Sequence, residues 1–289
     1  MVTGSPIPGV VAGLCDDAAV FPPGLAPLHE AVRAYRERQG TWYADLVGPL
    51  VLAAADLPRL GSLQAGPLPL SVTLPDGPAD LPAVVAATAS LPVDLRSVEV
   101  AVPDGTGVSE FLDQLAEAPH GDVDVYVEVP RDERRLPLIE AIAGRYRAKL
   151  RTGGVRADLY PGEAELADAV AALAAAGVPF KATAGLHHAL RNTDPETGFE
   201  QHGFLNLLLA TDVLAHGGTE PDARALLAER DGATVAGRVR DLDADRVHRA
   251  RAAFTSFGTC SITDPLTELV ELGLLTEPST ATTTGGATP

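Results

Sequence analysis

Eight short segments rich in Val, Leu and Ala recur along the 289-residue chain, and they constrain the fold more than any other feature. Their starts are mostly 22 to 37 residues apart, an interval that accommodates a strand, a helix and two short loops. Alternation of strands and helices favours a parallel sheet, and eight strands favour closure. The sequence therefore predicts an α/β fold, a (β/α)₈ TIM barrel, with these strands: Val10–Asp17, Val47–Ala55, Pro69–Pro75, Ser97–Pro103, Asp122–Pro130, Arg147–Gly154, Val178–Leu186 and Ala252–Ser261.

Helical patterns occupy the gaps between these segments. Residues 25–39, 108–118 and 162–177 carry apolar side chains at helical spacing, with Ser109 as an expected N-cap and Gly177 as a helix end. A doubly wound open sheet is the competing fold. Neither a GxGxxG nor a Walker-type loop follows the first strand, which disfavours that alternative.

The interval between the last two strands is about twice as long as the others. It contains three helix-like stretches, 202–217, 220–230 and 243–254, so we expect extra helices inserted between strands 7 and 8. The segment from Glu277 onward is poor in apolar residues. We therefore expect a single barrel domain over residues 1–276 and a disordered C-terminal tail over residues 277–289.

Composition limits the partners and the location. A net charge of −17 repels phosphate backbones and anionic lipids, so we expect no nucleic-acid partner and no membrane. The first residues lack the basic region of a signal peptide, which predicts a cytoplasmic protein. High Ala, Gly and Pro content is typical of a GC-rich bacterial genome. Exposed apolar helices in the long interval would allow a homo-oligomer.

Alternation along the strands predicts which polar side chains enter the barrel. Five neighbouring strands direct polar residues to one interior, namely Ser71, Thr73, Glu99, Glu128, Lys149, Arg151, Lys181 and Thr183. Isolated buried charges are costly and must be paired. These charges either form a structural ion network that plugs the barrel or constitute a catalytic interior.

The stretch "VPFKATAGLHHAL" places Lys181 in an apolar strand. Poor solvation and the nearby cations Lys149 and Arg151 should lower the pKa of Lys181. Its neutral amine would then attack a carbonyl group and form a Schiff base. Glu128 is the expected proton shuttle.

The segment "KATAG", Lys181 to Gly185, resembles the "KTSTG" strand motif of deoxyribose-phosphate aldolases. The resemblance implies a Schiff base on Lys181 in a TIM barrel, with Thr183 as a nearby hydroxyl. It covers five residues, of which only Lys181 and Gly185 are identical. The family's second active-site lysine, on the following strand, has no counterpart here, so its role would shift to Lys149 on the preceding strand.

Histidines follow strand 7, where such barrels place active sites. His187 or His188 is expected to act as acid/base or to bind substrate, with His202 approaching from the loop. A metal site would instead combine one of these two histidines with His202 and with Asp16 or Asp17. No metal-binding spacing signature such as HExxH supports that alternative, so we expect no metal and no cofactor.

The remaining strand ends carry candidates for substrate binding. Gly153, Gly154 and Gly258 offer backbone amides that can hold a phosphate or carboxylate, and Arg151 adds a positive charge. One of the two aspartates that end strand 1, Asp16 and Asp17, should cap a turn, and the other, expected to be Asp17, should face the barrel mouth. Cys15 and Cys260 lie on strands 1 and 8, which closure makes neighbours, so we expect reduced thiols close together.

These features favour a lyase of aldolase type that acts on a small anionic carbonyl compound, phosphorylated or carboxylated, through a lysine Schiff base. The expected catalytic residues are Lys181, Lys149, Glu128 and His187, and the expected substrate-binding residues are Arg151, Gly153, Gly154, Thr183, His188, Gly258 and Asp17. Two alternatives stay open: a metal-assisted hydrolase or isomerase, and a non-catalytic barrel that binds an anionic ligand.

Overall fold

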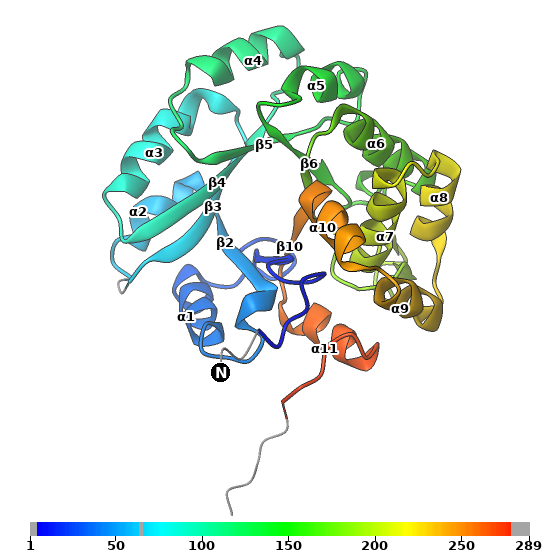
Figure 1. Cartoon of the computed structure of the whole chain (residues 1–289). Helices are drawn as coiled ribbons and strands as arrows, with labels where there is room; N and C mark the ends of the chain where they lie inside the picture. Colours follow the sequence, from blue (N-terminus) through cyan, green and yellow to red (C-terminus); the bar gives the residue numbers. More distant parts are fainter. Residues whose placement is uncertain (1–4, 64–65, 279–289) are drawn as a thin grey trace, which may run out of the picture.

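The computed structural model describes residues 5–63 and 66–278. Eight parallel strands close into a barrel in the order β1, β10, β7, β6, β5, β4, β3, β2 (Figure 1). The predicted (β/α)₈ architecture is therefore confirmed. The barrel strands are β1 (Cys15–Asp17), β2 (Val47–Ala53), β3 (Leu68–Leu74), β4 (Val93–Ala101), β5 (Asp124–Glu128), β6 (Arg147–Arg151), β7 (Phe180–Thr183) and β10 (Phe254–Thr259).

The first strand is much shorter than expected. The segment before it turns instead of extending: Val11 donates its N–H to the Pro8 carbonyl at 3.0 Å, and Gly13 donates to the Asp45 carbonyl at 2.7 Å. Gly13 has a φ of +60°, which is a left-handed conformation rather than a strand conformation. The predicted strand Val10–Asp17 therefore keeps only its last three residues.

Helices cover the outside of the barrel (Figure 1). Gly177, with a φ of +64°, ends α6 as expected. The prediction of Ser109 as the N-cap is wrong, because α4 begins at Val108 and its N-cap is Gly107. The helices that alternate with the strands are α1 (Leu28–Arg38), α2 (Leu57–Leu60), α3 (Leu81–Ala89), α4 (Val108–Glu117), α5 (Arg135–Ile142), α6 (Glu163–Ala176) and α11 (Thr263–Glu271). No helix in the described ranges is long and apolar enough to cross a membrane.

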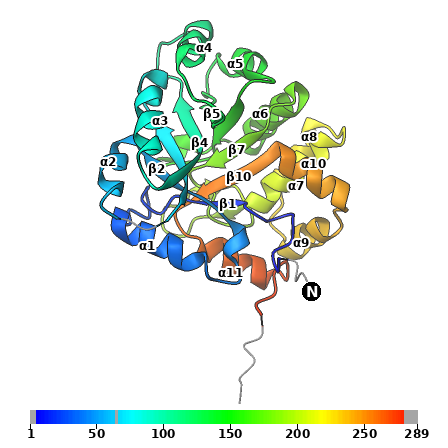
Figure 2. The same cartoon turned by 60° about the vertical axis from the view of Figure 1, so that its left-hand side comes forward.

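The long interval between β7 and β10 contains a two-stranded antiparallel ribbon and four helices, gathered on one side of the barrel (Figures 1 and 2). One helix, α9, was not expected, because "GATVAGRVR" contains two glycines and no long apolar stripe. The Asp231 carboxylate caps α9 by accepting the Thr234 N–H at 2.8 Å. The elements are β8 (Asn192–Thr193), β9 (Glu200–Gln201), α7 (Phe204–Ala215), α8 (Glu220–Ala228), α9 (Gly232–Arg240) and α10 (Ala244–Ala253).

The two strand faces differ in character, as the alternation predicts. Apolar residues such as Val98, Val100 and Val127 are fully buried in the hydrophobic core, and the polar residues that alternate with them enter the barrel. Of the tail expected to be disordered, residues 277–289, only the first two positions belong to the described residues.

Candidate active site

Polar residues of six strands, β1, β4, β5, β6, β7 and β10, meet inside the barrel. Lys149 on β6 and Lys181 on β7 are register partners. Glu128 on β5 is the partner of Lys149, and Ser256 on β10 is the partner of Lys181. Because alternate side chains of a strand lie on the same face, these neighbouring positions converge on one interior.

Lys181 is bound by two carboxylates. Its Nζ lies 2.6 Å from Asp16 Oδ2 and 2.5 Å from Glu99 Oε1. The Tyr126 ring centroid lies 5.4 Å from the same ammonium, within the range of a cation–π contact. Ser256 donates its hydroxyl to Asp16 Oδ2 at 2.8 Å and so completes the surroundings of this ion pair.

Glu99 joins the two lysines. Its second oxygen, Oε2, lies 2.8 Å from Lys149 Nζ. Lys149 also contacts Glu128 at 3.1 Å, and Glu128 lies 3.7 Å from Arg151. Three carboxylates thus face three cations in one connected set, which we call the interior ion network: Asp16, Glu99, Glu128, Lys149, Arg151 and Lys181.

The prediction that the pKa of Lys181 is lowered is wrong. Burial does act to lower the pKa of Lys181, but the charges and hydrogen bonds of Asp16 and Glu99 outweigh burial and raise it. The pKa of Lys149 is likewise raised, because Glu99 and Glu128 outweigh burial and the opposing charge of Lys181. Both lysines are therefore ammonium ions in the resting protein.

The two buried carboxylates differ. Burial acts to raise the pKa of Glu99, but the two lysines together outweigh burial and lower it. In Asp16 burial dominates and raises the pKa despite the contact with Lys181. Within the part of the chain that the structure describes, Asp16 Oδ1 is buried without a hydrogen-bond partner. A Cβ at position 48 would lie 2.1 Å from this oxygen, so Gly48 provides the space for the carboxylate.

Asp16 and Asp17 exchange the roles that were predicted for them. Asp17 was expected to face the mouth, but it accepts hydrogen bonds from Arg38 at 2.5 Å and from the Ala19 N–H at 3.2 Å. Asp16 points into the barrel in its place. The signal was present in the sequence, since the residue before a turn-capping aspartate on a strand must point to the opposite side.

A second signal lies in the basic residues of the chain. Of its 22 basic residues, only Lys149 and Lys181 are lysines, and all the others are arginines. Both lysines are buried inside the barrel, with 5% and 1% of their surface exposed. Every side-chain amine of this protein therefore belongs to the interior ion network.

The expected histidines do not join this network. His187 Nδ1 lies 3.5 Å from Cys260 Sγ, and burial lowers the pKa of His187. His188 pairs with Glu268 on α11 at 2.5 Å. His202 is fully buried and donates from Nε2 to the Pro161 carbonyl at 2.8 Å. Burial lowers the pKa of His202 to about 4, so this imidazole is neutral.

Close packing requires two of the three glycines that were expected to bind an anion, Gly153 and Gly154. A Cβ at Gly153 would lie 2.5 Å from the Tyr160 ring, and one at Gly154 would lie 2.4 Å from Leu159. A Cβ at Gly258 would lie 3.4 Å from Thr183 Oγ1. The hydroxyl of Thr183 is thus close to Gly258. Cys15 and Cys260 are both free thiols.

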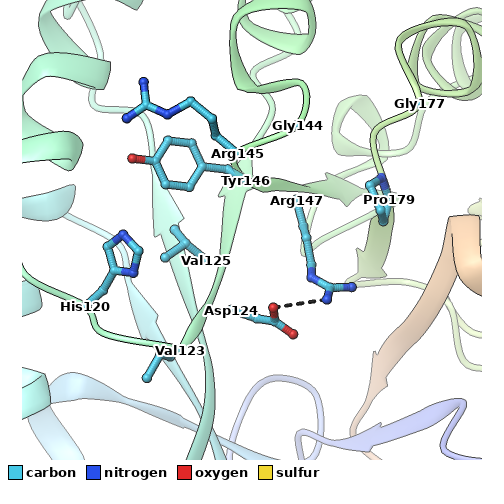
Figure 3. Close-up of a pocket in the computed structure, with 10 residues that line it drawn as sticks. All are labelled: His120, Val123, Asp124, Val125, Gly144, Arg145, Tyr146, Arg147, Gly177 and Pro179. Carbon is cyan, nitrogen blue, oxygen red and sulfur yellow. Dashed lines mark ion pairs between the residues drawn. The ribbon is translucent and has the colours of Figure 1, made fainter.

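Two cavities open among residues at the N-terminal ends of the strands. The larger, of about 310 Å³, is shown in Figure 3. Its lining includes His120, Arg145, Tyr146 and the Asp124–Arg147 ion pair of 3.0 Å. Arg147 is held by its ion pair with Asp124, and Arg145 lies 5.3 Å from the centroid of the Tyr146 ring, within the range of a cation–π contact.

The smaller cavity, of about 180 Å³, reaches the interior ion network. Lys181 and Asp16 line its inner part, together with Tyr126, Ser97 and Ser256. The opposite end of the network, at Glu128 and Arg151, lies where β5 and β6 end. The network therefore extends between the two ends of the barrel.

No group of three or more His, Cys, Asp or Glu residues in the described ranges could hold a metal ion. The histidines and aspartates considered for such a site have the separate partners given above. No protein-family model matches the chain, and no curated protein matches its sequence. The function must therefore be inferred from the barrel and its interior.

Proposed function

We propose that this protein is a lyase of aldolase type that forms a Schiff base between an interior lysine and a small anionic carbonyl compound. One observation carries the proposal: the only two lysines of the chain are buried side by side in the barrel, with carboxylates on both amines. Arginine cannot serve as an amine nucleophile because its guanidinium stays protonated. If the network needed only positive charge, arginine would suffice, because every other basic residue of this chain is an arginine.

The carboxylates provide the proton acceptors that the reaction needs. A protonated lysine must lose a proton before it attacks a carbonyl group. Asp16 contacts Lys181, and Glu128 contacts Lys149. The pKa of Asp16 is raised and that of Glu99 is lowered, so Asp16 is the stronger base of the two carboxylates that contact Lys181. Arg151, at the exposed end of the network, is the proposed contact for the substrate's phosphate or carboxylate.

Reductive trapping tests the proposal. The protein is incubated with pyruvate, glyoxylate, dihydroxyacetone phosphate and glyceraldehyde 3-phosphate in turn, and borohydride is added. We expect a gain in intact mass equal to one carbonyl compound less one oxygen atom. The Lys149→Arg/Lys181→Arg double variant keeps both positive charges and the terminal amine, so its labelling is the background. Wild-type labelling no higher than this background across the panel would contradict the proposal.

A non-catalytic barrel that binds an anionic ligand is the second candidate. The equal numbers of cations and carboxylates favour it, as do the raised pKa values of both lysines. Such a barrel would bind the same compounds without trapping, which calorimetry on the wild type would detect.

A further inference from the structure

The two lysines differ in exposed side-chain surface, although the smaller cavity is lined by Lys181 and not by Lys149. The side chain of Lys181 is 2% exposed, and so are both of its carboxylate partners. Lys149 is 7% exposed, its partner Glu128 is 21% exposed, and Arg151 beyond Glu128 is 43% exposed. Exposure therefore rises step by step from Lys181 toward the C-terminal ends of β5 and β6.

The contacts of the two amines differ in the same direction. Lys181 is bound at 2.6 and 2.5 Å, and Lys149 at 2.8 and 3.1 Å. The longest of these contacts is the one to Glu128, which has Arg151 as a second cationic partner. A small movement of Glu128 toward Arg151 would release Lys149 on one side. Lys181 shares Glu99 with Lys149, but within the described residues neither of its carboxylate partners pairs with Arg151.

From these differences we propose that Lys149 is the nucleophile and that Lys181 is a positioning residue that stays protonated. This inference rests on the proposed function and reverses the roles that the "KATAG" motif suggested. An anionic carbonyl compound that enters at the C-terminal ends of β5 and β6 meets Arg151 first and Lys149 next. Lys181 lies one strand further along and contacts Glu99, which holds both amines.

The chemical step balances within these residues. The Lys149 ammonium gives one proton to Glu128, and its nitrogen forms a bond to the carbonyl carbon while the C=O π bond breaks. A second amine proton moves to the former carbonyl oxygen, which gives a carbinolamine. Glu128 then returns its proton to the hydroxyl group, water leaves, and a protonated imine forms. One ammonium and one carbonyl compound have become one iminium and one water.

Charges on β4, β5 and β7 act on Lys149. Glu99 on β4 and Glu128 on β5 favour its ammonium form, and Lys181 on β7 opposes it. Arg151, on β6 itself, acts through Glu128. A neighbouring lysine was expected to lower the pKa of Lys181. In the structure, it is the charge of Lys181 that acts to lower the pKa of Lys149. Removing the charge of Lys181 should raise the pH at which trapping is half-maximal, and an arginine at position 181 should restore it.

Peptide mapping of the trapped adduct tests the assignment. We expect the reduced adduct on the peptide that contains Lys149, loss of the adduct in Lys149→Arg, and its retention in Lys181→Arg. In Lys181→Met, half-maximal trapping should move up by about one pH unit, in line with the effect of one nearby charge. Lys181→Arg keeps the assignment testable if Lys181→Met does not fold.

The possible failures are distinguishable. An adduct on the Lys181 peptide would overturn this inference and leave the proposed function intact. Wild-type labelling at the background level would overturn both. An adduct on Lys149 with the same pH profile in Lys181→Met and the wild type would overturn the positioning role of Lys181.

Discussion

Residues carried by strands and residues carried by loops behave differently in this barrel. The charged side chains of β4 to β7 form one connected network, with Glu99 in contact with both lysines. The histidines after β7 have separate partners: Cys260, Glu268 and the Pro161 carbonyl. Strand alternation directs side chains to a common interior, whereas a loop can turn each side chain toward whichever neighbour packs against it. Strand positions are therefore the stronger guide to a site in such a fold.

The largest effect should come from breaking the strand-borne network. Glu99→Gln leaves Lys149 with one carboxylate and Lys181 with one, inside the barrel. Removing one partner of a buried ion pair costs about 3 to 5 kcal/mol of unfolding free energy, and we expect a loss in this range by urea denaturation. Glu117→Gln, on the exposed surface of α4, is the control and should change stability by less than about 0.5 kcal/mol. A loss of that small size in Glu99→Gln would show that the network does not support the fold.

A smaller effect should come from the strand end that was expected to hold an anion. Gly153→Ala places a Cβ against the Tyr160 ring, and overpacking costs about 1 to 3 kcal/mol. Gly237→Ala, on α9, meets no atom within 4 Å and should keep or raise stability. Thermal unfolding of both variants makes the comparison. If both alanines are tolerated equally, close packing is not the reason for a glycine at position 153.

The smallest effect should come from a loop-borne pair, His188 and Glu268. The hydrogen bond from Glu268 raises the pKa of His188, so the pair is fully formed below the unfolded pKa of about 6.5. Its contribution is lost as pH rises through the higher pKa of the folded state. His188→Gln should therefore cost about 0.5 kcal/mol at pH 5.5, a value discounted for solvent screening, and little at pH 9.

Glu268→Gln tests the same pair from the other side. Its amide oxygen can still accept the Ala189 N–H, which Glu268 Oε2 accepts in the wild type. The pH-dependent part of the loss should match that of His188→Gln in chemical denaturation at the two pH values. A loss that is equal at pH 5.5 and pH 9 in both variants would assign the effect to packing.

The sequence by itself determined the barrel, its eight strands and most of its interior charges. Hydrophobic alternation is a local property of each strand. A period of two places Glu99, Glu128, Lys149 and Lys181 each on the polar face of its own strand. The sequence also contains two further indications of the site. Asp16 precedes the turn-capping Asp17 on the same strand, and lysine occurs only at two strand positions.

Only the tertiary structure decided how those charges pair. The distance from Lys181 to Asp16 depends on closure, which brings β1 and β7 to opposite sides of β10 although they are 165 residues apart at this contact. The pKa of a buried lysine depends on the balance between burial and such contacts, and here the carboxylates outweigh burial. Periodicity therefore specifies which side chains enter the barrel, but their protonation and their access to substrate depend on neighbours that are distant in the chain.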